Sequence, residues 1–339
     1  MKVGIIGLPN CGKSSLFNLL TQARAPVGLY PFTTIDKNIG IVAVKDERLE
    51  RLAQITNPQK KTPATIQFVD IAGLVKGAST GEGLGNKFLA HIREVNLMLH
   101  LVRVFDHPNI PHIYGSIDPR RDYEIVEYEL FMADLEMIER RLDRIKKKVE
   151  AREEIEILER VKGLIVQGQK PDPAEIPLKI LLELPLLVIK PEEVVLNFPS
   201  DGRVETNLKG YALSVGLEEE ILDFPETEKR ELRESLKLNP DGIEGLIEIC
   251  FRRLDLIRFY TIKGEETRAW AIKRGTTALE AAGQIHSDLR DGFIRAEVVN
   301  VDELIAAGNF ASAVKSGKAK VEGREYEVKD GDVLLIKFR

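Results

Sequence analysis

The sequence has few cysteines and lacks long apolar runs, and each shortage excludes a class of protein. Cys11 and Cys250 are the two cysteines among 339 residues, too few for a disulfide framework. Because no stretch of about 18 uninterrupted apolar residues occurs, we expect no membrane-spanning helix and no membrane partner. The chain opens directly on a strand-like segment, so we expect no cleavable signal peptide and a cytoplasmic protein.

A surplus of positive charge is also missing. The formal net charge is −5, so no overall basic field favours nucleic acid, and we expect no DNA partner. Toward the C-terminus basic and acidic residues are nearly balanced, and a mixed solvated surface is the simplest interpretation. A folded cleft could still gather Lys273, Arg274 and Arg295 on one face, where they could contact RNA. The hydrophobic (43%) and charged (30%) fractions are typical of a globular protein, and the length allows two or three domains.

What is present is a phosphate-binding motif in the right setting. Residues 7–14 spell G-x-x-x-x-G-K-S, after an apolar strand-like run (residues 2–6) and before a helical pattern that ends near Gln22. Backbone N–H groups of such a loop surround phosphate oxygens, while Lys13 reaches the β- and γ-phosphates. The alternative is a chance match in an ordinary strand–helix turn, which this context disfavours. The expected nucleotide contacts in and beside the loop are Asn10, Cys11, Gly12, Lys13, Ser14 and Ser15.

Three further residues fit a sensor of the γ-phosphate. Thr34, in a proline-marked loop, and Asp70, at the end of the predicted strand 65–70, supply hard oxygen atoms suited to Mg²⁺. Together with the Ser14 hydroxyl they form the predicted metal site. Gly73 has no side chain to keep its N–H away from the γ-phosphate. These elements reproduce a switch in which nucleotide and metal hold two loops.

The expected base-binding segment follows a predicted strand that ends at Asn197. Guanine-specific switches place a carboxylate three residues after such an asparagine, but this chain has Ser200 there. A neutral hydroxyl cannot make the paired, charge-assisted contact to guanine; Asp201 lies one residue too late. We expect Asn197, Ser214 and Val215 to contact the nucleotide.

Catalysis needs another device, because Leu74 stands where signalling GTPases have a water-orienting glutamine. His112 is a candidate for positioning the attacking water, although a lone histidine is more often structural. Lys13 and Gly73 are the other candidate catalytic groups, through their contacts with the phosphates. Asn10 could help to hold a monovalent cation such as K⁺ beside the β- and γ-phosphates, where the cation would act as an arginine finger does.

The middle of the sequence changes character. Apolar residues from Phe131 to Val149 follow a heptad pattern, and a second helical pattern follows at residues 155–165. We favour an antiparallel helical hairpin over a single amphipathic helix lying on the sheet. Core strands are predicted at residues 40–44, 97–105, 193–197 and 210–215. After a helix over residues 243–256, the C-terminal part is predicted to contain strands at 268–272 and 295–299, a helix at 277–286 and a final strand at 332–338.

Three segments carry a resemblance to a known family. Residues 7–14 (GLPNCGKS), 30–35 (YPFTTI) and 70–78 (DIAGLVKGA) resemble the Obg-like ATPase family, YchF subfamily, of P-loop NTPases. Residues 268–276 and 283–298 are similar to that family's TGS domain. The family pattern Asn-x-x-Glu at the base differs here at Ser200, and Glu192 and Glu193 open a strand that is apolar in the family.

The resemblance implies an α/β fold: a Ras-like P-loop NTPase domain, an inserted α-helical coiled-coil hairpin and a C-terminal β-grasp (TGS) domain. We place these at residues 1–120 with 177–256, at 121–176 and at 257–339. It further implies Mg²⁺-dependent hydrolysis of ATP in preference to GTP, a role for His112 in hydrolysis, and association with the ribosome or a ribosomal subunit and RNA, in translation or stress regulation. Two alternatives stay open: a GTP-using ribosome-assembly factor, and a nucleotide-gated binding protein with negligible turnover.

Overall fold

The computed structural model describes residues 1–22, 39–71 and 84–339, which form two compact units. Residues 1–22, 39–40, 68–71 and 84–246 belong to the first unit, and residues 41–67 and 247–339 to the second. Within the described ranges no helix is both long and apolar enough to cross a membrane.

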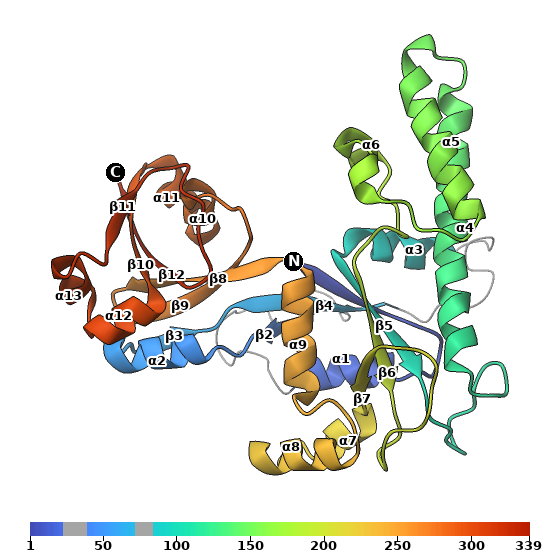
Figure 1. Ribbon diagram of the computed structural model, residues 1–339, viewed down its shortest axis with the longest axis horizontal. Coiled ribbons are helices and arrows are strands. Elements are labelled where there is room, and N and C mark those ends of the chain that lie inside the picture. The colour runs from blue at the N-terminus through green and yellow to red at the C-terminus, as the bar shows by residue number, and fades with distance from the viewer. Residues whose placement is uncertain (23–38, 72–83) are drawn as a thin grey trace. The chain divides into compact units, whose positions relative to one another are not determined.

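The first unit contains most of a six-stranded sheet in the order β2-β4-β1-β5-β6-β7 (Figure 1). β5 is buried at every position and pairs in parallel with β1 and β6, as expected of a central strand covered on both faces. The strands are β1 (Lys2–Ile6), β2 (Ile39–Ala43), β4 (Thr65–Asp70), β5 (Leu97–Arg103), β6 (Glu192–Asn197) and β7 (Tyr211–Leu213). The α/β prediction is confirmed, and the strands predicted here lie within two residues of their observed positions.

The helices of the first unit follow the strands of this sheet. They are α1 (Lys13–Gln22), α3 (Leu84–Glu94), α7 (Val215–Glu220), α8 (Glu226–Ser235) and α9 (Gly242–Arg253), the last of which continues into the second unit. α1 begins at Lys13, within the last residues of the phosphate-binding motif, so a helix follows the loop as predicted. Ser214 begins α7 by accepting a hydrogen bond from Leu217 N.

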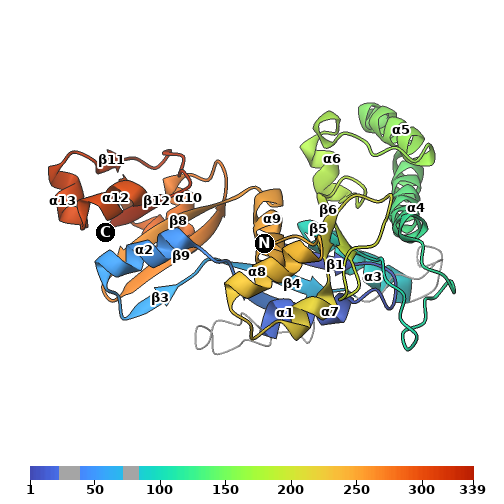
Figure 2. The same cartoon turned by 60° about the horizontal axis from the view of Figure 1, so that its bottom comes forward.

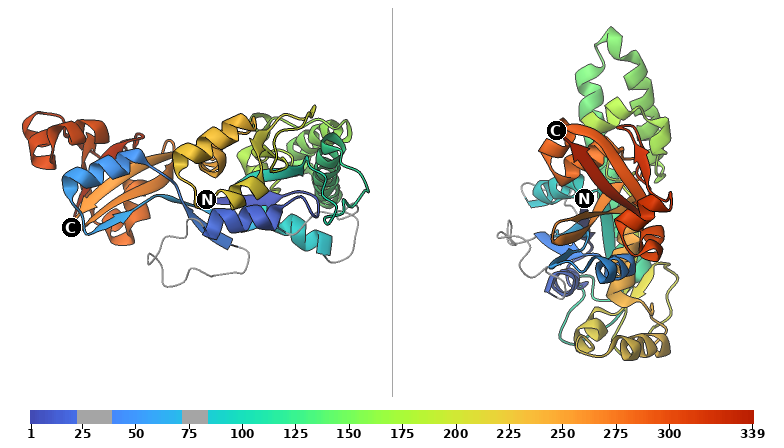
Figure 3. Two further views of the ribbon diagram at one scale, coloured as in Figure 1. Left: turned by 90° about the horizontal axis from the view of Figure 1, so that it is seen from below. Right: turned by 90° about the vertical axis from the view of Figure 1, so that its left-hand side faces the viewer.

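The predicted helical hairpin is present. α4 (Pro119–Ile145) and α5 (Arg152–Val166) run side by side and extend beyond the strands, as Figures 1 and 3 show. The heptad residues Ile138, Leu142 and Ile145 are buried in one cluster with residues of α5. Short segments complete this part: η1 (Val149–Ala151), η2 (Pro173–Glu175) and α6 (Leu178–Glu183).

The bounds of α4 differ from the predicted heptad pattern of Phe131 to Val149 at both ends. The helix begins earlier because Asp118 caps it, accepting from Arg121 N, and Pro119 occupies its first position. It ends at Ile145, so Val149 lies in η1 and not in the seam.

The second unit is built on a sheet in the order β11-β10-β12-β8-β9-β3 (Figures 1 and 2). Its strands are β3 (Lys60–Thr62), β8 (Leu256–Lys263), β9 (Glu266–Lys273), β10 (Phe293–Asn300), β11 (Lys320–Glu322) and β12 (Asp332–Phe338). Apolar clusters form on both faces. One includes residues of α10 (Ala278–Ile285) and α11 (Ser287–Asp291), and the other includes residues of α2 (Glu47–Thr56), α12 (Val301–Ala307) and α13 (Phe310–Lys315).

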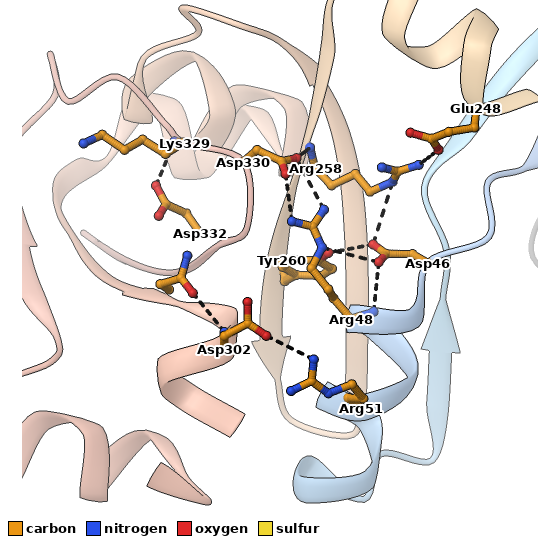
Figure 4. Close-up of polar contacts among 11 residues, drawn as sticks. Asp46, Arg48, Arg51, Glu248, Arg258, Tyr260, Asp302, Lys329, Asp330 and Asp332 are labelled. Carbon is orange, nitrogen blue, oxygen red and sulfur yellow. Dashed lines mark hydrogen bonds and ion pairs between the residues drawn. The ribbon is translucent and has the colours of Figure 1, made fainter. Parts of the chain in front are cut away.

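Residues 41–67 depart from the predicted division, which placed them in the nucleotide-binding domain. β3 pairs in parallel with β9, and Leu49 and Leu52 of α2 pack in the same cluster as Tyr260. Polar contacts reinforce this packing (Figure 4): Asp46 accepts from the Tyr260 hydroxyl at 2.6 Å, and Arg48 pairs with Asp330 at 2.7 Å. The assignment of residues 257–339 as a TGS domain stays a prediction.

Candidate nucleotide site

The loop between β1 and α1 has the backbone that phosphate binding requires. Gly7 (φ 146°), Asn10 (φ 63°) and Gly12 (φ 101°) adopt conformations that most residues avoid. Two of the three also have no room for a side chain. A Cβ on Gly7 would lie 2.4 Å from the Leu101 carbonyl oxygen, and one on Gly12 would lie 2.7 Å from Asn197 Nδ2. The glycines of the motif are therefore fixed by contact as well as by conformation.

Lys13 and Cys11 lie inside this loop. Lys13 is 7% exposed, and its ammonium donates to the Leu8 carbonyl oxygen at 2.8 Å, so it is held against the loop it is predicted to serve. Cys11 is 2% exposed, and burial raises the pKa of its thiol. Burial and a raised pKa are typical of a cysteine that packs as a small apolar residue and not of a reactive thiolate.

Two of the three predicted metal ligands meet. The Ser14 hydroxyl donates to Asp70 Oδ2 at 2.9 Å, which brings the start of α1 and the end of β4 together. A hydroxyl beside a carboxylate is a pair of hard oxygen donors of the kind that Mg²⁺ takes in P-loop NTPases, together with phosphate oxygens and water. These residues therefore fit the ion. Thr34 and Gly73, like Leu74, lie outside the described residues.

Asn197 joins the phosphate loop to the base-binding segment. Its Nδ2 donates to the Cys11 carbonyl oxygen at 2.9 Å, and its Oδ1 accepts from Val215 N at 3.0 Å. The side chain is 3% exposed. Asn197 thus connects the loop to the start of α7. Its contact with the nucleotide stays a prediction. Ser214 is buried as well, and its hydroxyl caps α7.

A cavity of about 510 Å³ opens beside these residues, within the size range of small-molecule sites. It lies between the phosphate loop, the segment after β5 and the start of α7. Its lining includes Asn10, Ser15, Asn197, Ser200, Val215 and Gly216. The cavity is therefore lined by some of the predicted phosphate contacts and some of the predicted base contacts together. Ser200, at the sequence position of the guanine-binding carboxylate, lines it as well.

His112 lies close to the phosphate loop but is turned away from solvent. Its Nε2 bonds Asp122 Oδ2 at 2.7 Å, and its Nδ1 accepts from Tyr114 N at 3.2 Å. The His112 side chain is 4% exposed. A void of about 10 Å³ separates it from Leu8, Pro9 and Cys11 of the phosphate loop.

Arg103 and Asn10 tie the loop that carries His112 to the nucleotide site. Arg103, at the end of β5, donates to the carbonyl oxygens of Phe105 and Ile110 at 2.8 Å each. Asn10 Nδ2 donates to the Pro111 carbonyl oxygen at 3.1 Å. The residue next to His112 is therefore bonded to the phosphate loop itself.

A buried ionic cluster next to β5 explains the first of the two glutamates that open β6. His100 Nδ1 lies 2.8 Å from Glu192 Oε1, and Lys170 and Tyr123 donate to Glu192 Oε2 at 3.1 and 3.2 Å. Burial alone would raise the pKa of Glu192, but His100 and Lys170 lower it to about 2. The strand starts at Glu192, one residue before the predicted start, since the first charge has partners inside the fold.

Sequence reasoning missed Asp122, Arg103 and Glu192 as members of this region. An acidic residue in the first turn of a helix is the ordinary preference of the helix dipole, so Asp122 carried no distinct signal. A single arginine within a buried apolar strand is a signal that could have marked Arg103, because such a charge needs several acceptors nearby.

Comparison with known proteins gives the same outline. Residues 2–153 match the family model of a 50S ribosome-binding GTPase, and residues 256–339 match YchF-GTPase_C, described as a protein of unknown function. The chain is 41% identical to the ribosome-binding ATPase YchF of Bacillus subtilis, an alignment that covers 100% of this chain and 99% of the relative. The chain belongs to the YchF family.

Other YchF proteins support this assignment. YchF of Escherichia coli O157:H7, also named a ribosome-binding ATPase, is 38% identical over 99% of both chains. The solved YchF GTPase of Schizosaccharomyces pombe superposes with a TM-score of 0.84 at 31% identity, covering 99% of this chain and 97% of that one. The YchF fold therefore extends over nearly the whole sequence, including residues 41–67.

Proposed function

We propose that this chain is a molecular switch that hydrolyses ATP with Mg²⁺, accepts GTP as a second substrate, and acts on ribosomes in the cytoplasm. The observation that carries the proposal is the bond between Ser14 and Asp70 at the mouth of a phosphate loop. It supports a metal-nucleotide site in a chain whose full-length relatives are named ribosome-binding ATPases.

The residues divide the task as follows. The loop N–H groups and Lys13 bind the phosphates, and Asn197 keeps that loop aligned with the base cavity. Bound Mg²⁺ would neutralise charge that develops on the phosphates, with Ser14, Asp70 and Thr34 as its protein partners. Thr34 and Gly73 contact the γ-phosphate and so respond to its presence or loss. The hairpin and the C-terminal unit bind the ribosome and RNA.

The base cavity supports relaxed specificity. Ser200 can donate and accept a hydrogen bond, so it suits either purine, whereas a carboxylate would favour guanine. Asn10 keeps its amide oxygen available for a monovalent cation while its Nδ2 is bonded to Pro111. We expect K⁺ to accelerate turnover relative to Na⁺.

The test is a turnover assay with ATP and GTP in competition, with and without Mg²⁺ and ribosomes. Ser14→Ala should reduce Mg²⁺-dependent hydrolysis by about 10²-fold or more, as expected for removing a group that acts on the transition state. Ser235→Ala, on α8 far along the chain from the site, is the matched control. Hydrolysis that is unchanged in Ser14→Ala would contradict the proposal.

The retracted His112 favours a second possibility, in which nucleotide occupancy is the signal and the isolated protein turns over slowly. Both ring nitrogens are bonded within the protein, so the ring cannot orient water in this conformation. His112→Ala distinguishes the two: it should abolish stimulated hydrolysis and leave nucleotide binding intact if His112 positions water, and should change neither if binding alone is the signal.

A further inference from the structure

The bond between His112 and Asp122 is unusually well fixed. His112 Nδ1 accepts from a backbone N–H, which is always a donor, so the ring proton lies on Nε2 and points to Asp122 Oδ2 at 2.7 Å. Both side chains are 4% exposed. The neighbours of His112 along the chain, Ile113 and Tyr114, are 38% and 36% exposed, so the histidine is the inward-pointing residue of its loop.

Arg121 holds the other oxygen of the same carboxylate. Its Nε and NH2 donate to Asp122 Oδ1 at 3.1 and 2.8 Å, and the guanidinium also bonds the Ser116 hydroxyl and carbonyl oxygens at 3.0 and 2.7 Å. The carboxylate therefore cannot turn to follow the histidine if the loop moves. Charge-assisted bonds of this kind are stronger than neutral ones.

Asp122 belongs to the helix that forms the hairpin. It lies in the first turn of α4, which continues without interruption to Ile145. One residue further, Tyr123 bonds Glu192, and Glu127 pairs with Lys170 at 2.7 Å, so the base of α4 is attached to the sheet through polar contacts. A displacement of the hairpin that strains these contacts acts directly on the partner of His112.

We propose that Asp122 is a latch that keeps His112 away from the attacking water until the hairpin moves. The inference rests on the proposed role of His112 in hydrolysis and adds the residue that positions it and the element that controls it. A partner bound along α4 and α5 would release the ring from Asp122, and the ring would then be free to bond water at the phosphates. Asp122 acts through His112 and is therefore a positioning residue.

Asp122→Asn separates the latch from the fold. The asparagine has the same shape but one oxygen, and Arg121 and His112 Nε2–H both require an acceptor from it. Whichever way the amide turns, its NH₂ faces a donor, so one of the two bonds is lost. We expect kcat without ribosomes to rise about three- to tenfold with KM unchanged, because the loss of one hydrogen bond to a charged group shifts the ring toward its free state.

Three further variants complete the design. Asp118→Asn removes the same charge from the same helix end but keeps its cap, since asparagine caps as well as aspartate, and should leave kcat at the wild-type value. His112→Ala should abolish hydrolysis, and the double variant of His112→Ala and Asp122→Asn should be as inactive as His112→Ala. The rise in kcat of Asp122→Asn must therefore depend on the presence of His112.

The histidine tautomer gives a readout that does not depend on turnover. Nitrogen chemical shifts of labelled full-length protein should show the Nε2–H form of His112 in the wild type and Asp118→Asn, and a mixture of forms in Asp122→Asn. An Nδ1–H form in the wild type overturns the latch, and this spectrum decides the matter if Asp122→Asn does not fold.

The kinetic outcomes separate the latch from the proposed function. A wild-type protein that hydrolyses no nucleotide, or a His112→Ala variant with full activity, would refute the role of His112. If His112 is needed but Asp122→Asn has unchanged or reduced kcat, the hydrolytic role stands and the latch is wrong. A gain that persists in the double variant also overturns the latch.

Discussion

Polar side chains make different kinds of connection in the two units. At the nucleotide site, Asn197, Arg103 and His112 connect loops to one another, and each bonds a backbone or side-chain group of a segment with a predicted functional role. In the second unit, Asp46 and Arg48 connect a distant segment to the sheet, through Tyr260 and Asp330. We therefore expect substitutions in the first set to affect both stability and activity, and substitutions in the second set to affect stability alone.

The largest expected effect is on activity alone. Lys13→Ala should lower hydrolysis by about 10²–10³-fold, because it removes a positive group that stabilises charge on the transferred phosphate. Its native bond is to the Leu8 carbonyl oxygen of the same loop, so the unfolding midpoint should change little. Turnover and urea unfolding are measured on the same preparation, with Lys45→Ala as control. If the fraction of folded protein fell as much as turnover did, the effect of Lys13→Ala would not be on activity alone.

Asn197→Ala should reduce both properties. It leaves the Cys11 carbonyl oxygen and Val215 N–H without their bonds, and unsatisfied buried groups cost about 1–3 kcal/mol each. Nucleotide affinity should fall in the same variant, because the loop and the cavity lose their common anchor. Urea unfolding and calorimetric titration with a nucleotide test this, and Asn207→Ala on an exposed loop is the control. Normal affinity in a destabilised Asn197→Ala would show that the anchor serves the fold alone.

Glu192→Gln should change how stability depends on pH. The pKa of Glu192 is lowered from 4.5 to about 2, so this group stabilises the fold above pH 4.5, and that contribution is lost as the pH falls toward 2. The variant should be less stable at neutral pH by about 2–3 kcal/mol and should lose less stability on acidification. Urea unfolding at several pH values between 2.5 and 7 measures both, with Glu156→Gln on the exposed face of α5 as control. Parallel acid profiles would contradict this assignment.

Asp46→Ala should show the smallest effect on stability and no effect on turnover. The change removes the cap of α2 and the acceptor of the buried Tyr260 hydroxyl, which together should cost about 2 kcal/mol. Asp46→Asn keeps the cap and should cost less. Turnover per folded molecule should stay at the wild-type value in both. A change in turnover would show that residues 41–67 take part in the switch.

The local sequence predicted what depends on local pattern. The phosphate loop, the flanking β1 and α1, the strand ending at Asp70, and the hairpin all follow from motifs or periodicity, and the structure has them. The pairing of Ser14 with Asp70 follows as well, because both lie at the same edge of a parallel sheet. These features need no knowledge of distant contacts.

What the sequence did not predict depends on contacts made by the folded chain. The bonds of Asn197 to Cys11 and of His112 to Asp122 are set by packing, and the sequence pattern holds no trace of them. Glu192 looked out of place in a strand because its partners, His100 and Lys170, come from elsewhere in the chain. For the same reason the sequence did not predict that residues 41–67 belong to the second unit. Their short strands and single amphipathic helix are weak local patterns that do not identify a distant packing partner.

Because residues 41–67 pack in the second unit, the protein cannot be divided into two stable fragments near residue 256. A shortened protein that stops at residue 256 would still carry α2, but Leu49 and Leu52 would lose the apolar partners that residues 257–339 supply. The separate C-terminal piece would in turn lack the strand that borders β9. Either fragment is expected to aggregate, so the role of the C-terminal portion is better examined by point substitution than by deletion.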